Sequence, residues 1–161
     1  MSTNKRKPKI KIQYHRTCFH SLQYEIVTIY KKDASITDIV NEAIKDFPEL
    51  GFMTEDQYSG AGAITILPPN SSRTIYMIYG EDLTYDIVAH ESIHATSFSF
   101  YLVQTQHNEQ TEEIYAYNFQ SILIEITRVL LDEFKIDKEL FYGIKKEEGL
   151  DIEINDITDN K

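Results

Sequence analysis

The chain has 161 residues, of which 42% are hydrophobic, and a formal net charge of -10 at pH 7. This length and hydrophobic content predict one domain with a core of its own. The negative charge argues against nonspecific binding to DNA or to anionic lipid, because both surfaces would repel the protein at long range. We therefore expect no nucleic-acid partner and no membrane partner.

The sequence also bears on compartment and on metal chemistry. It contains no run of the roughly 18 to 20 apolar residues that a membrane span needs, and its start lacks the apolar stretch of a secretory signal, so we expect a cytoplasmic protein. Cys18 is the only cysteine, which excludes an intramolecular disulfide and a zinc site made of cysteines. Charge runs at the ends predict a flexible basic arm (residues 1–9) and a flexible acidic tail (149–161).

The first half of the chain alternates strand patterns with one helix pattern. Alternating apolar residues predict a first strand at Ile10 to Tyr14, and residues 24–30 (YEIVTIY) predict a second. Residues 35–47 repeat apolar side chains at helical spacing, which predicts an amphipathic helix that begins at Ser35 and ends before Pro48. Residues 48–62 are expected to form a loop.

The second half begins with two more strand patterns, at residues 63–67 (AITIL) and 74–79 (TIYMIY), which we expect to pair as antiparallel neighbours. Long helices are predicted at about residues 84–105 and 111–134, and a short helix within 137–148. The helix at 111–134 is apolar on more than one face, so we expect it to be central and packed on several sides. The fold class is α+β, in which a small, mainly antiparallel sheet packs against the amphipathic helix and the two long helices.

The most informative motif is His-Glu-x-x-His, formed by His90, Glu91 and His94 within the first long helix. Four residues advance a helix by about 400 degrees, so both histidines project from one face and can bind one metal ion. The Glu91 carboxylate lies beside them, where it can take a proton from an activated water and later deliver it to a leaving amine. The competing interpretation is a chance motif, which residue frequencies place on the order of 1% for a chain of this length.

A catalytic zinc ion needs three protein ligands and one position that stays open for water. Downstream of the motif, the sequence offers Glu109, Glu112 and Glu113. We favour Glu113, because Glu112 would point about 100 degrees away from it, toward a helix edge that meets solvent. Tyr117 lies four residues after Glu113 and so shares its helix face.

The motif followed by Glu113 resembles the gluzincin class of zinc metallopeptidases, in which a glutamate from a following helix completes the zinc site. Residues 88–96 (VAHESIHAT) and 112–117 (EEIYAY) also resemble small phage-encoded zincin-like proteins, and the resemblance covers about residues 60 to 135. It implies a single zincin-like domain that binds Zn2+ through His90, His94 and Glu113. It further implies that residues 66–79 supply a sheet edge for an extended substrate.

By the same resemblance, the protein would be a hydrolase that cleaves a peptide or protein substrate, with Glu91 as the general base. Gluzincins add a histidine or tyrosine that stabilises the oxyanion, and Tyr117 is the best candidate, ahead of Tyr115, Tyr101 and His107. Two other functions remain open: a zincin-like protein in which zinc is only structural, as in a phage assembly role, and an acidic decoy that binds a basic protein surface. The oligomeric state stays open.

Overall fold

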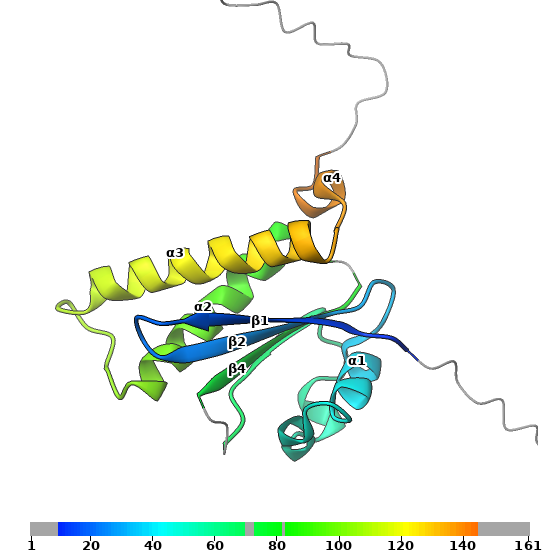
Figure 1. Cartoon of the computed structure of the whole chain (residues 1–161), viewed down its shortest axis with the longest axis horizontal. Coiled ribbons are helices and arrows are strands. Elements are labelled where there is room, and N and C mark those ends of the chain that lie inside the picture. Colours follow the sequence, from blue (N-terminus) through cyan, green and yellow to red (C-terminus); the bar gives the residue numbers. More distant parts are fainter. Residues whose placement is uncertain (1–9, 70–72, 82, 145–161) are drawn as a thin grey trace, which may run out of the picture.

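Four strands form one sheet in the order β1-β2-β4-β3 in the computed structural model, which describes residues 10–69, 73–81 and 83–144 (Figure 1). The predicted basic arm and acidic tail lie outside the described residues. β1 pairs with β2 and β3 pairs with β4 in antiparallel fashion, whereas the central pair, β2 and β4, is parallel. The strands are β1 (Gln13–Phe19), β2 (Tyr24–Tyr30), β3 (Ala63–Ile66) and β4 (Thr74–Tyr79).

The structure confirms the α+β class and the antiparallel pairing of β3 with β4. Two expectations about the strands are wrong. β1 begins at Gln13 rather than Ile10, because its seven residues pair in register with all seven of β2 and that pairing sets the strand. Residues 66–79 do not supply a sheet edge either, since β4 lies between β2 and β3; the edge on this side is β3.

Helices cover both faces of the sheet (Figure 1). Residues of α1 and the turn after it pack with one face, while α2, α3 and α4 pack with the other. No helix in the described part of the chain is long and apolar enough to cross a membrane. The helical elements are α1 (Ile36–Ala43), η1 (Pro48–Phe52), η2 (Glu55–Gln57), α2 (Tyr85–Leu102), α3 (Glu112–Arg128), η3 (Val129–Glu133) and α4 (Lys138–Phe141).

α1 begins where the sequence predicts and ends earlier. The Ser35 hydroxyl caps the helix by accepting the backbone N–H of Asp38 at 3.2 Å. The helix stops at Ala43 rather than near Phe47, and Pro48 opens a short 3-10 turn in the segment that was expected to be a loop. The buried α1 residues all lie on the sheet side, as an amphipathic helix requires: Ile36, Ile39, Val40 and Ala43.

α3 lies on the surface, so the expectation of a central helix packed on several sides is wrong. Its buried residues are Asn118, Ile122 and Ile126, which form a single stripe. Its outer apolar side chains remain open to solvent, with Tyr117 65% and Ile124 56% exposed. Apolar residues occur on several faces of α3, but the described elements pack against only one of these faces.

A buried polar chain fixes α3 against the rest of the fold. The Tyr24 hydroxyl of β2 donates to Asn118 Oδ1 at 2.9 Å, and Asn118 Nδ2 donates to Ser99 Oγ of α2 at 2.6 Å. The sequence did not predict these hydrogen bonds, because an asparagine in a helix is usually expected to be exposed. Its three members join β2, α3 and α2, and therefore set the rotation of α3 about its own axis.

Replacing Asn118 with leucine should destabilise the protein by about 1 to 3 kcal/mol, because the buried Tyr24 hydroxyl then loses its acceptor and Ser99 loses its donor. Urea unfolding followed by circular dichroism measures the change. Gln120→Leu is the matched control, since it makes a similar change at an exposed position of the same helix. An equal effect of the two substitutions would contradict the role given to the polar chain.

Candidate metal and catalytic site

His90 and His94 lie on the exposed face of α2, one helical turn apart. Their Nε2 atoms are 3.1 Å from each other. Zinc binds imidazole nitrogen at about 2.0 to 2.1 Å, so a tetrahedral ion needs its two nitrogens about 3.3 to 3.4 Å apart. The two rings thus present a nearly correct pair of donors for one ion. The same distance also suits a hydrogen bond between one protonated and one unprotonated ring nitrogen.

Glu91 points from α2 toward the sheet, whereas His90 and His94 are exposed. Its side chain is only 7% exposed, and Thr65 of the edge strand β3 donates its hydroxyl to Glu91 Oε2 at 2.6 Å. The same hydroxyl also lies 3.2 Å from the backbone oxygen of Glu91. The carboxylate directly after His90 in the motif is therefore held between α2 and β3.

The sheet beneath Glu91 carries a second hydroxyl, that of Tyr79 on β4. This side chain is fully buried, and its hydroxyl has no hydrogen-bond partner among the described residues. Burial raises the pKa of the Tyr79 hydroxyl well above its usual value, and the negative charge of Glu91 raises it further. The Tyr79 hydroxyl and the Glu91 carboxylate therefore interact electrostatically. Two hydroxyls, those of Thr65 and Tyr79, thus influence the Glu91 carboxylate.

The third ligand is not brought together with the histidines. Within residues 10–69, 73–81 and 83–144, no group of three or more His, Cys, Asp or Glu side chains is placed to hold a metal ion. Glu109, Glu112 and Glu113 are all exposed, at or just before the start of α3. The choice of Glu113 as a ligand therefore stays a prediction.

The rotation of α3 nevertheless bears on the choice between the two glutamates. The Tyr115 hydroxyl lies 3.0 Å from Ser97 Oγ and donates to the backbone oxygen of Ile93 at 3.3 Å, so Tyr115 marks the side of α3 that faces α2. Glu112 precedes Tyr115 by three residues and lies about 60 degrees from it around the helix, whereas Glu113 lies about 160 degrees away. Both glutamates are exposed, and Glu112 lies nearer to the side of α3 that faces α2.

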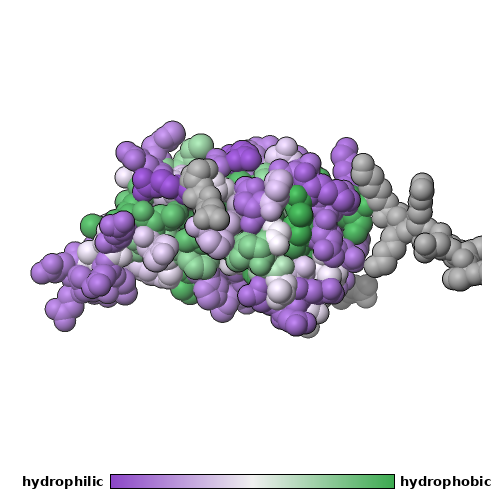
Figure 2. All heavy atoms as spheres, turned by 90° about the horizontal axis from the view of Figure 1, so that it is seen from below, coloured by the Kyte–Doolittle hydropathy of each residue, from purple (hydrophilic) through white to green (hydrophobic). Residues whose placement is uncertain are grey.

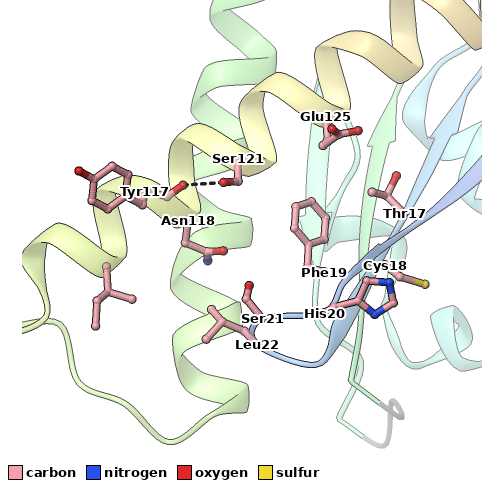
Figure 3. A pocket seen from close by; sticks show the side chains of 11 residues that line it. Thr17, Cys18, Phe19, His20, Ser21, Leu22, Tyr117, Asn118, Ser121 and Glu125 are labelled. Carbon is pink, nitrogen blue, oxygen red and sulfur yellow. Dashed lines mark hydrogen bonds between the residues drawn. The ribbon is translucent and has the colours of Figure 1, made fainter.

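The candidates for the tyrosine that stabilises the oxyanion also lie on different sides of α3. Tyr117 shares the outer face of α3 with Glu113 and lines a cavity together with the β1–β2 hairpin (Figure 3). Tyr115 instead contacts α2 at Ile93 and Ser97, which come one residue before and three residues after His94. The His107 ring packs against the Tyr115 ring, with centroids 4.4 Å apart and planes tilted by 40°. By position, Tyr115 is better placed than Tyr117 to act near the histidine pair.

Residues 104–111, which link α2 to α3, are polar throughout and mostly exposed. Figure 2 shows a strongly hydrophilic projection at the end of the molecule where this loop lies. The loop carries His107 and Glu109, so it brings further titratable side chains to the side of α2 on which Tyr115 packs.

An apolar cavity of about 460 Å3 lies between the end of β3 and the second half of α2. Leu67 and Pro68 line it from the strand side, and Phe98 and Tyr101 line it from the helix. Ser97, one turn after His94, also lines it, so the cavity continues along the side of α2 that carries the histidines. Neither this cavity nor Thr65 was identified from the sequence, because both depend on how β3 lies against α2.

Comparisons with protein-family models, with curated proteins and with solved structures find no match for this chain. The resemblance to gluzincins therefore stays a prediction from the motif. The functional argument depends on the geometry of α2, β3 and the start of α3.

Proposed function

We propose that this protein is a zincin-like, zinc-dependent hydrolase of peptide bonds. The observation that carries the proposal is the pair of imidazole nitrogens 3.1 Å apart on the exposed face of α2, together with the motif residue Glu91, whose carboxylate is held by β3 in the same turn of the helix. The spacing follows from helix geometry, and it offers two suitably spaced nitrogen donors for one ion. A chance motif would also leave Glu91 unexplained as a nearly buried carboxylate next to them.

The donor set fits zinc in its chemistry. Two neutral imidazoles and one carboxylate form a ligand set known for catalytic zinc. When bound, zinc lowers the pKa of a water molecule to about 7 and polarises the substrate carbonyl. His90 and His94 would supply the nitrogen ligands, and a carboxylate from the start of α3 would supply the oxygen. Bringing that carboxylate to the histidines requires the first turn of α3 or the loop before it to move toward α2.

Glu91 would act as the general base. Its Oε2 already accepts a hydrogen bond from Thr65, which leaves Oε1 to accept a proton from the attacking water and pass it to the leaving amine. The surrounding core removes competing solvent from the carboxylate. Tyr115 is the candidate to stabilise the developing oxyanion, and its hydroxyl proton would move from the backbone oxygen of Ile93 to the oxyanion.

The substrate would be a peptide or protein segment in extended conformation. The outer edge of β3 runs past the Thr65–Glu91 contact, and no described strand pairs with that edge. The apolar cavity at the end of β3 would accept one bulky apolar side chain of such a segment. Both features favour a polypeptide over a small polar substrate.

Metal analysis of Glu112→Ala and Glu113→Ala beside the parent protein tests the ligand set. The parent should bind one zinc per chain, and the packing of Tyr115 leads us to expect that Glu112→Ala weakens zinc binding about 100-fold or more, since losing a ligand costs at least as much as losing its supporting partner. Glu113→Ala is the matched control, with the same change one position away. Weakening by Glu113→Ala alone would restore the choice made from the sequence, and failure of the parent to bind zinc would refute the proposal.

A further inference from the structure

We propose that Thr65 is the positioning residue of Glu91, an inference that rests on the proposed function. Thr65 sits on β3, which is separate in sequence from the motif helix, yet its hydroxyl reaches both the carboxylate and the backbone oxygen of Glu91. It therefore fixes the base relative to the sheet, and not only relative to its own helix.

The contact has the geometry of a strong, charge-assisted hydrogen bond. Its length of 2.6 Å falls within the range of about 2.5 to 2.7 Å that is typical when a hydroxyl donates to a carboxylate. The hydroxyl has a single proton, and the carboxylate oxygen is the nearer of its two acceptors, so the proton goes mainly to Oε2. The other carboxylate oxygen is then free to take a proton from water.

The strand makes Thr65 a rigid support. Thr65 pairs with Met77 in the β3–β4 ladder, and Met77 is fully buried. The threonine side chain is branched at Cβ, so few rotamers are open to it and the hydroxyl is held in one direction. A base held in this way loses little freedom when the substrate arrives, which is the condition for efficient proton transfer.

Tyr79 explains why a fixed direction matters. Its fully buried hydroxyl lacks a partner among the described residues and interacts electrostatically with Glu91. Without Thr65, the carboxylate would lose the hydrogen bond that ties it to β3 and would be free to reorient relative to the Tyr79 hydroxyl. Thr65 thus holds the Glu91 carboxylate in a fixed position between α2 and β3.

The test compares Thr65→Val, which removes the hydroxyl at constant shape, with Thr65→Ser, which keeps it. Thr28→Val is the matched control, because Thr28 is a buried threonine on β2 whose hydroxyl has no partner among the described residues. Each zinc-loaded variant is assayed on a casein-derived peptide library, and kcat and KM are measured on the best-cleaved peptide. We expect Thr65→Val to lower kcat about 10- to 100-fold at unchanged KM and zinc content, and Thr65→Ser to restore kcat to within about 3-fold.

A second readout needs no activity. In metal-free protein, Thr65→Val should lower the melting temperature by about 3 to 6 °C, and this loss should shrink by more than half when Glu91 is alanine, because the two groups are coupled. A parent that cleaves peptides while Thr65→Val keeps full kcat would overturn the positioning role and leave the proposed function standing. If the parent binds zinc but cleaves nothing, both fall, and coupling in the metal-free protein then assigns the contact to stability alone. Loss of kcat in Thr28→Val equal to that in Thr65→Val would also overturn the inference.

Discussion

Glu91→Gln should bind zinc as tightly as the parent protein and lose nearly all hydrolytic activity. Glutamine keeps the size of the side chain and still accepts a hydrogen bond from Thr65 through its amide oxygen, so the fold around it is preserved. It has no basic oxygen for the proton of the attacking water, and a general base contributes about 100- to 10,000-fold to a rate. Peptide cleavage and zinc content, measured on the same preparation, check both parts of the expectation.

A matched control for this change is Glu125→Gln on α3. Glu125 forms an exposed ion pair with Arg128 at 3.0 Å, and it has no role in the proposed chemistry. The Glu125→Gln variant should therefore keep both its bound zinc and its hydrolytic activity. Full activity in Glu91→Gln would refute the assigned mechanism, and a loss of zinc from that variant would identify Glu91 as a mainly structural carboxylate.

His94→Ala should abolish zinc binding and the stabilisation that zinc provides. Removal of one imidazole leaves His90 without its partner 3.1 Å away, so the remaining donors bind zinc weakly. A ligand that binds only the folded state raises stability by about 2.7 kcal/mol at 100 times its dissociation constant. Isothermal titration calorimetry with zinc, together with melting curves with and without added zinc, measures both effects.

His20→Ala is the control for the histidine substitution, because His20 is an exposed residue in the β1–β2 turn. It should bind zinc and melt like the parent. Chelation of the parent should remove activity, and added zinc should restore it. Zinc binding that survives in His94→Ala would place the metal elsewhere and contradict the site on α2.

The sequence predicted some elements to the residue and misplaced others. β2 and β4 were predicted with correct bounds, because they are buried runs that strand propensity and flanking turns define locally. The start of β1 was predicted three residues too early, since pairing with β2 decides which residues of a half-exposed segment join the sheet. The position of α3 could not be read from its apolar residues, because several of them, including Ile114 and Ile124, face solvent.

For the candidate site too, local features could be predicted from the sequence and tertiary contacts could not. The proximity of His90 and His94 follows from helix geometry alone, so it could be predicted without knowing the fold. The side that α3 turns to α2 depends on side-chain contacts, above all those of Tyr115 and Asn118, and these contacts set how Glu112 and Glu113 lie relative to α2. Thr65 looked like an ordinary strand residue, and only the tertiary structure brings it to Glu91.

The parallel pairing of β2 with β4 has a consequence for the order of folding. β1–β2 and β3–β4 are each joined by short connections, but Glu25 pairs with Thr74 across nearly fifty residues, so closing the sheet requires a long loop to be ordered first. Thr65, Tyr79, Glu91 and both histidines all belong to the single stretch of residues 63–94. We therefore expect the half of the molecule that carries the proposed base to acquire native contacts early, and the β1–β2 hairpin to dock onto it afterwards.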